Sequence, residues 1–356
     1  MMTSQFQKEI SYRITDEDIQ AGLTVVETVL KRRFGLTAKE ISRLKFSEPG
    51  ILLKSSEASV YKKVRSTQKV SCGNEIKICM PERPLRQEKV PPVDREVEIL
   101  YEDEDFLALN KPSGMVTHPG NGHHEDALAN IAAGYCRKMG YDCSCKVIGR
   151  LDKETSGIVL FGKHRLAVSR LQDLMKIGEY EKTYLALAYW DSKETADLNK
   201  EYMIHSSMGP VKGDLMKQEI KPPGEGKEAI THFHIQRIIQ NTALLEVRTE
   251  TGRTHQIRLH LASEGHPLLG DRLYGMPLSG EMAKRTMLHT WKIRFLHPFS
   301  NTYVSITAPI PEDMNCLFSS REFTTKDHKS ASEQTQTLYR DSFFALQRGI
   351  SRYNRL

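Results

Sequence analysis

One carboxylate in the chain, Asp152, stands in an unusual chemical setting. In the stretch GRLDKETSGIVLFGK it lies between the cations Arg150 and Lys153, and a Thr-Ser-Gly turn separates it from four large apolar residues. An apolar run of that length predicts a buried strand, so the carboxylate would lie at the entrance to the core. A turn aspartate that accepts backbone N–H bonds fits the same residues. An ionised carboxylate held out of water beside a cation would instead be a candidate nucleophile.

Arg253, in TGRTHQIRLH, is the cation that the sequence offers as the partner of Asp152. It falls in the first turn of a predicted helix, where a cation opposes the helix dipole, so its guanidinium is expected to point at an anion elsewhere. An arginine within about 4–6 Å would lower the pKa of a carboxyl by roughly 1–3 units and keep it ionised in a dry pocket. The alternative for Arg253 is an exposed position on an amphipathic helix.

Tyr184 lies in EKTYLALAYW, whose apolar residues predict a buried strand. A tyrosine there can be an ordinary core residue, or an aromatic platform on which a flat ring stacks. Residues 157–163 spell G-x-x-x-x-G-K, but the residues between are apolar and His164 stands where a phosphate loop has Ser or Thr. No GxGxxG, HExxH or GxSxG pattern occurs in the chain. The commonest nucleotide, zinc and serine-hydrolase signatures are therefore missing.

The excess of positive charge is confined to the N-terminal part of the chain. The net charge of the 356 residues is +6, and residues 1–90 alone hold 17 Lys and Arg against 11 Asp and Glu. A basic module on a neutral body is typical of proteins that bind a polyanion. No apolar run is long enough to span a membrane, and the polar N-terminus predicts no secretory signal. Six cysteines without a CxxC pair predict reduced thiols and a cytoplasmic protein.

The elements that must position these residues form two predicted domains. Apolar spacing predicts two short helices in residues 20–46, followed by small strands, and this basic layout resembles the alpha-L RNA-binding module. We expect that module over residues 1–85 and a proline-rich linker over 86–97. Strands joined mostly by turns favour an α+β catalytic domain over residues 98–315, with a mostly antiparallel mixed sheet and flanking helices. A tail is expected over residues 316–356.

Five segments of the second domain together resemble the RluA-type pseudouridine synthases. They are LNKPSGMVTHPG (109–120), RLDKETSG (150–157), EKTYLAL (181–187), TGRTHQIRLHLASEGHPLLGDRLYG (251–275) and LHTWKIRFLHP (288–298). The chain departs from the pattern of this family at Gly149, where many members have His. The resemblance implies an isomerase that converts uridine in RNA to pseudouridine. It needs no cofactor and no metal, so the missing cofactor signatures agree with it.

The resemblance also implies roles for five residues. Asp152 matches the essential aspartate, Arg253 the arginine that pairs with it, and Tyr184 the tyrosine that stacks on the target base and assists proton removal. Leu288 matches an apolar residue of the pocket, and Arg150 the arginine that fills the gap left by the flipped nucleotide. The implied partner is ribosomal RNA or transfer RNA, with no membrane. We expect a monomer that acts in the cytoplasm.

Two rival functions come from other classes. A glycoside hydrolase or nucleosidase also uses a carboxylate, but it needs a second acid, and Glu154 is expected to point away from Asp152. A catalytically silent RNA-binding protein would require damaged site residues, whereas Asp152, Tyr184 and Arg253 are all present.

Overall fold

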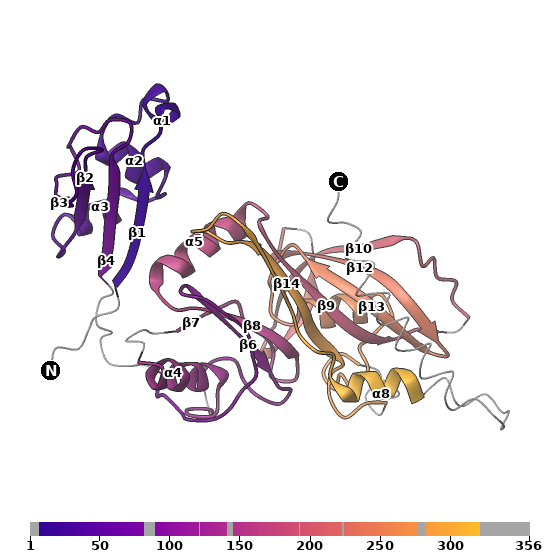
Figure 1. Ribbon diagram of the computed structural model, residues 1–356. Helices are drawn as coiled ribbons and strands as arrows, with labels where there is room; N and C mark the ends of the chain where they lie inside the picture. Colours follow the sequence, from indigo (N-terminus) through magenta and orange to yellow (C-terminus); the bar gives the residue numbers. More distant parts are fainter. Residues whose placement is uncertain are drawn as a thin grey trace, which may run out of the picture.

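The computed structural model describes residues 7–81, 90–120, 122–140, 145–191, 193–222, 224–275 and 282–320. Its strands form two separate sheets, one of four strands near the N-terminus and one of eleven strands in the rest of the chain. Figure 1 shows the small sheet and its helices at one end, beside helix α5. Residues 86–89 of the predicted linker and residues 321–356 of the predicted tail lie outside the described residues.

The N-terminal unit is a four-stranded antiparallel sheet covered by three short helices. Its sheet order is β1 (Gln7–Arg13), β4 (Glu75–Pro81), β2 (Ile51–Lys54) and β3 (Lys62–Lys63). The helices are α1 (Asp16–Gln20), α2 (Val26–Arg32) and α3 (Ala38–Leu44). The side chain of Thr37 caps α3 by accepting from the N–H of Glu40. The two predicted helices are thus present, whereas strand β1, which pairs along its whole length with β4, is an addition.

Contacts join this unit to the rest of the chain at helix α5 (Arg165–Lys176). Leu166 of α5 is buried in the hydrophobic core of the N-terminal unit, and Phe299 packs against the same core. The guanidinium of Arg170 lies so close to Gly35 that a Cβ there would be 2.7 Å from its Nη1. The N-terminal unit is therefore packed onto the helix that leads into strand β9.

The large sheet has the order β11, β10, β12, β13, β9, β14, β8, β6 and β5, with β15 paired to β14 and β7 paired to β8. Its bounds, from one edge, are β11 (Asp214–Lys221), β10 (Glu201–Val211), β12 (Lys227–Ile239), β13 (Thr242–Thr249), β9 (Tyr180–Tyr189), β14 (Leu288–Leu296), β8 (Ser156–Gly162), β6 (Phe106–Lys111), β5 (Ile99–Glu102), β15 (Tyr303–Thr307) and β7 (Lys146–Ile148). Among the pairings of the described strands, β14 with β8 is parallel and the others are antiparallel. The predicted α+β class with a mostly antiparallel sheet is confirmed.

Within the described residues, four helices belong to this part of the chain. They are α4 (Leu128–Lys138), α5, α6 (Gln256–Ser263) and α8 (Glu312–Ser320). Every residue of β8 is buried, as its apolar run predicts. Residues 201–221 form the β10–β11 hairpin at one edge of the sheet. The domain boundaries drawn from the sequence stay a prediction.

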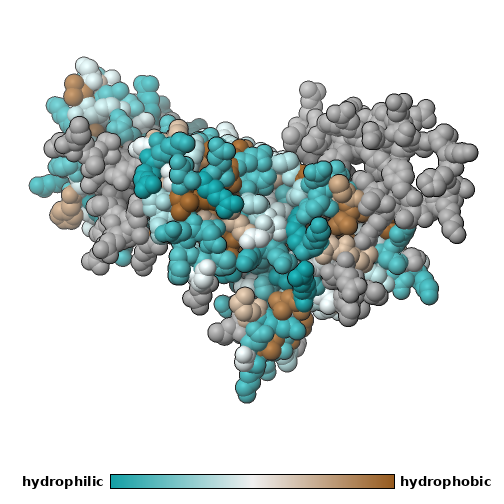
Figure 2. All heavy atoms as spheres, turned by 90° about the horizontal axis from the view of Figure 1, so that it is seen from below, coloured by the Kyte–Doolittle hydropathy of each residue, from teal (hydrophilic) through white to brown (hydrophobic). Residues whose placement is uncertain are grey.

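The cysteine prediction is wrong for two residues, because Cys136 and Cys145 form a disulfide. The end of α4 and the start of β7 lie next to each other, which the sequence separation of nine residues does not reveal. Figure 2 shows a mostly hydrophilic face with apolar atoms in separate patches. No helix in the described ranges is long and apolar enough to cross a membrane.

Candidate active site

Five segments distant in sequence meet around one cavity of about 310 Å³. They are the loop between β7 and β8, the end of α5, the first half of β9, the loop between β13 and α6 with the start of α6, and the first residue of β14. Strands β13, β9, β14 and β8 are consecutive neighbours in the sheet, which is why these segments converge (Figure 1). Its wall includes all five residues selected from the sequence: Arg150, Asp152, Tyr184, Arg253 and Leu288.

Asp152 is paired with Arg258, and this corrects the predicted pairing with Arg253. Oδ2 of Asp152 lies 3.8 Å from Nη1 of Arg258. The other side of that guanidinium is held by Asp271, with Nε to Oδ2 at 2.7 Å and Nη2 to Oδ1 at 2.8 Å. Arg258 and Asp271 are both buried, at 8% and 1% exposure, and the Asp152 side chain is 19% exposed. A buried bidentate pair therefore fixes the cation that faces Asp152.

Burial and Asp271 shift the pKa of Arg258 in opposite directions. Burial favours the neutral guanidine, but the hydrogen bonds and charge of Asp271 outweigh it, so the pKa of Arg258 is raised. The charge beside Asp152 is therefore permanent. His255, whose Nε2 lies 4.0 Å from Oδ2 of Asp152, differs in this respect. Burial lowers the pKa of His255 despite the nearby Asp152, so His255 is neutral at pH 7.

Arg253 lies on the cavity wall but is exposed and engaged elsewhere. Its Nε donates to the backbone oxygen of Glu228 at 2.9 Å. Helix α6 begins at Gln256, so Arg253 belongs to the preceding loop and not to the first helical turn. Arg258 occupies the first turn instead, on the buried side. Its position between Ile257 and Leu259 was the sequence signal that Arg258 is buried. A buried arginine requires an anionic partner.

Gln256 connects the loop before α6 to strand β12. Its Nε2 donates to the oxygen of Ile230 and to Oγ1 of Thr231, while its Oε1 accepts from Thr251 and from the N–H of Arg253. His255 adopts a φ of +56°, a left-handed conformation that is uncommon outside glycine. Non-glycine residues held in this region concentrate at functional sites. The THQIR stretch thus holds the loop and presents Arg258 to Asp152.

Tyr184 and Leu288 form an apolar part of the cavity wall. Leu288 is buried, and Tyr184 packs against the same hydrophobic cluster. Burial, and after it the negative charge of Asp152, raises the pKa of Tyr184 far above its usual value. The tyrosine hydroxyl is therefore protonated at neutral pH. Arg150 lies on the cavity wall, two residues before Asp152 in the chain, and it is exposed.

The loop that carries Asp152 is held from below by Lys111 and Thr117. Nζ of Lys111 is buried and donates to the backbone oxygens of Pro112, Met115 and Lys153 at 2.7–3.0 Å. Burial lowers the pKa of Lys111 to about 7. Thr117 accepts from the N–H of Leu151 and donates to its carbonyl oxygen. Lys111 stands in no sequence pattern that indicates this role.

The residues after Asp152 join the loop to β14. Gly157 has a φ of +106°, and a Cβ there would collide with the backbone of Thr290, to which Gly157 is paired. Only glycine fits at this position near the start of β8 for that reason. Oγ of Ser156 lies 2.9 Å from Nδ1 of His289, and burial lowers the pKa of His289 to about 3.

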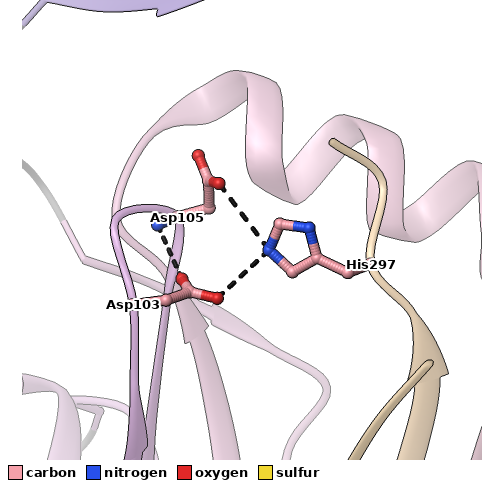
Figure 3. Close-up of side chains that lie close together, drawn as sticks. All are labelled: Asp103, Asp105 and His297. Carbon is pink, nitrogen blue, oxygen red and sulfur yellow. Dashed lines mark hydrogen bonds and ion pairs between the residues drawn. The ribbon is translucent and has the colours of Figure 1, made fainter. Parts of the chain in front are cut away.

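A second group of titratable side chains, Asp103, Asp105 and His297, lies away from this cavity (Figure 3). The three residue types could ligate a metal. However, Oδ1 of Asp103 accepts the backbone N–H groups of Asp105 and Phe106, and its Oδ2 lies 3.1 Å from Nε2 of His297. Asp105 pairs with His164 at 2.7 Å. These bonds tie the β5–β6 turn to the end of β14 and the start of α5, a structural task.

Comparisons with known proteins agree with this arrangement. The family model described as RNA pseudouridylate synthase matches residues 105–263. The protein named uncharacterized RNA pseudouridine synthase YhcT of Bacillus subtilis is 37% identical over 224 residues, which is 62% of this chain and 71% of that protein. YlyB of the same organism, with the same description, is 33% identical over 70% of this chain and 80% of its own length. Ribosomal large subunit pseudouridine synthase D of Xylella fastidiosa is 34% identical over 65% of this chain and 70% of its own length.

The matched region contains Asp152, Tyr184, Arg253 and Arg258 on the wall of one cavity. The chain therefore belongs to the RNA pseudouridylate synthase family and is an RNA pseudouridine synthase, an isomerase that converts uridine in RNA to pseudouridine.

Proposed function

We propose that the isomerisation takes place in the cavity described above, with the carboxylate of Asp152 as the group that attacks the uridine. The observation that supports this most strongly is the position of Asp152 on the cavity wall, 3.8 Å from a guanidinium that Asp271 holds by two hydrogen bonds. The guanidinium places a permanent positive charge opposite the carboxylate of Asp152. An ionised carboxylate is the form that can act as a nucleophile.

The reaction exchanges one bond to the sugar for another. The bond between the base nitrogen N1 and C1′ breaks, the base turns, and a bond between C5 and C1′ forms. The proton on C5 is released and N1 gains one, so the product has the same composition as the substrate. Attack of Asp152 on C1′ or on the base ring are both compatible with this balance.

Tyr184 is proposed as a stacking platform for the uracil ring, with Leu288 as the apolar neighbour. Its raised pKa argues against the tyrosinate acting as a base in the free enzyme. Arg150, exposed at the cavity and adjacent to the Asp152 loop, is proposed to fill the space that the flipped nucleotide leaves. Arg253 is exposed, and its Nε donates to the backbone oxygen of Glu228. We therefore propose that Arg253 contacts the RNA instead of pairing with Asp152.

Ribosomal RNA is the proposed substrate, and transfer RNA is the second candidate. Several relatives carry the name ribosomal large subunit pseudouridine synthase D, which supports the first choice. The basic N-terminal unit would add phosphate contacts that do not depend on the base sequence. We propose that the enzyme acts in the cytoplasm as a monomer, without a cofactor.

A nucleosidase would need a second acid near Asp152. Glu154 does not line the cavity, and its Oε2 accepts from the N–H and the hydroxyl of Thr286. Glu250 does line the cavity, but its Oε1 pairs with His232 at 2.8 Å. The rival is therefore distinguished by its product: a nucleosidase releases free uracil, whereas a pseudouridine synthase releases none.

Mapping of pseudouridine in ribosomal and transfer RNA from cells with and without this protein tests the proposal. We expect one or more positions, in ribosomal RNA, to lose pseudouridine in the absence of the protein and to regain it with the wild-type chain. An unchanged map would contradict the assigned substrate. Loss confined to transfer RNA would replace ribosomal RNA by the second candidate.

A further inference from the structure

Strand β9 presents three polar side chains to the cavity at every second position: Tyr180, Lys182 and Tyr184. Successive side chains of a strand point to opposite faces, so these three share one face. Two residues of a strand span about 6.6 Å, so Lys182 lies one step along the wall from the proposed stacking position at Tyr184. None of the site roles assigned above uses Lys182.

Lys182 differs from Arg258 and Arg253, two other cations of the cavity wall, in its partners. Arg258 is paired with two carboxylates, and Arg253 donates to a backbone oxygen. In the described part of the chain, no carboxylate lies within 4 Å of the Lys182 ammonium, which instead lies 5.8 Å from the ring centroid of Tyr180. Burial alone lowers the pKa of Lys182 to about 8. A partly desolvated ammonium without an anion is costly unless a ligand supplies one.

Gly149 leaves open the space that this ammonium uses. Its φ is +76°, and a Cβ at this position would lie 2.9 Å from Nζ of Lys182. A side chain at residue 149 would therefore displace the ammonium. Gly149 is exposed, so Nζ lies where the cavity meets the surface of the loop that carries Arg150 and Asp152.

We propose that Lys182 binds a phosphodiester group of the RNA next to the uridine that enters the cavity. The inference rests on the proposed position of the reaction in this cavity. When the uracil ring lies on Tyr184, its sugar and phosphate extend from the ring along the wall. The ammonium of Lys182, two residues away on the same face of β9, has the charge that complements the phosphate. The bond is charge-assisted, which makes it strong for its size. The competing ligand, a carbonyl oxygen of uracil, is neutral and would leave the ammonium without an anion.

The test compares Lys182→Met with Lys182→Arg and with the control Lys200→Met. Lys200 also lies over a tyrosine ring, at 5.0 Å from the centroid of Tyr202, but it does not line the cavity. The probe is a fluorescein-labelled oligouridylate, whose Kd is measured by anisotropy at pH 7 over a range of salt concentrations. Thermal melting of each variant verifies that it is folded.

A contact with one phosphate predicts a definite change in the salt dependence. The slope of log Kd against log salt is expected to become shallower by about 0.7 in Lys182→Met, the value for one phosphate contact to a single strand. The slope of Lys182→Arg and of Lys200→Met is expected to stay at the wild-type value. An unchanged slope in Lys182→Met would overturn the proposal, even if affinity falls, because a contact with a base carbonyl releases no counterion.

A second readout uses the RNA that the mapping experiment identifies. With that RNA, Lys182→Met is expected to raise KM about ten- to a hundredfold, the range of a hydrogen bond between charged groups, and to change kcat less. If the wild-type chain makes pseudouridine and Lys182→Met behaves like Lys200→Met, the inference about Lys182 is overturned while the function stands. If the wild-type chain makes none, the proposed function fails, and the binding slopes still decide whether Lys182 contacts phosphate.

Discussion

At the scale of single residues, the active site depends on which of two arginines faces Asp152. The sequence selected the right residue types but paired Asp152 with Arg253, whereas Arg258 lies at 3.8 Å. Both arginines belong to one short motif, and the start of the helix decides which of them turns inward. Sequence patterns locate helix ends only to within a few residues, so helical position alone could not decide between the two arginines. The apolar neighbours of Arg258, Ile257 and Leu259, were the sequence signal that favours it as the buried one.

Arg258→Lys and Arg253→Lys therefore form a matched pair of substitutions. Lysine keeps the charge but cannot hold Asp271 with two hydrogen bonds and reach Asp152 at the same time. We expect Arg258→Lys to lower kcat by about a hundredfold or more, because a group misplaced at a reacting centre can cost that much. Arg253→Lys should cost less than about tenfold and act on KM. Single-turnover rates measure both, and a larger loss of rate in Arg253→Lys would restore the pairing drawn from the sequence.

At the scale of elements, the Asp152 loop is positioned by neighbours that carry no chemistry themselves. Lys111 at the end of β6 binds three backbone oxygens, one of them on Lys153 in the loop. Buried β8 was readable from the sequence, since an apolar run has a local meaning, whereas the predicted Thr-Ser-Gly turn is wrong because Ser156 and Gly157 already belong to β8. The role of Lys111 was not readable, because its acceptor on Lys153 becomes a neighbour only when β6 and β8 pair.

Lys111→Met should destabilise the folded protein. It leaves buried carbonyl oxygens without a donor, which costs about 2–4 kcal/mol in total. The free energy of unfolding from urea titration measures the loss, and activity should fall as the loop loosens. Lys153→Met, an exposed lysine of the same loop, is the control and should change stability by less than about 0.5 kcal/mol. Equal stabilities of the two variants would contradict this account of Lys111.

The pairing of β14 with β8 makes stability depend on pH through His289. Burial lowers the pKa of His289 to about 3 and that of His260 to about 4, so both stay neutral in the folded state while the unfolded chain binds protons below about pH 6.5. Stability is therefore complete above that value and is lost as the pH falls. Each histidine should cost about 1.4 kcal/mol between about pH 7.5 and 5.5.

Urea titrations at the two pH values measure this loss of unfolding free energy. His289→Gln should reduce the loss by about 1.4 kcal/mol, the contribution of one histidine. Asp18 and Asp103 do not contribute in this pH range, because their pKa values are lowered to about 2. Burial also lowers the pKa values of His118, His255 and His266, so the comparison of His289→Gln with wild type is what isolates His289. A wild-type protein that is equally stable at both pH values would contradict the assignment.

At the scale of the whole molecule, a neutral catalytic body carries a basic N-terminal unit that packs on α5. The charge asymmetry and the two short helices could be predicted, because composition and helical spacing are local properties. The contact through Leu166 and the guanidinium of Arg170 could not, since nothing in α5 marks it as a partner of residues 7–81. Deleting the unit would expose Leu166, so substitutions on its surface are the better test of its role.

Four exposed basic residues of this unit are suitable: Arg32 on α2 and Lys39, Arg43 and Lys45 on or next to α3. Their joint replacement by alanine should weaken RNA binding and reduce its salt dependence, since each lost phosphate contact reduces the slope by about 0.7–0.9. The rate on saturating RNA should stay within about twofold of wild type. Unchanged affinity and slope would show that the unit does not bind RNA.

The proposed mechanism depends on the carboxylate of Asp152 acting on the uridine. Asp152→Asn keeps the shape of the side chain and removes its charge, so the purified variant should bind RNA while forming no pseudouridine, and release of tritium from RNA labelled at C5 of uridine measures that directly. Loss of tritium release with RNA affinity within about threefold of wild type is the expected result. Tritium release at or near the wild-type rate would show that another group carries out the reaction.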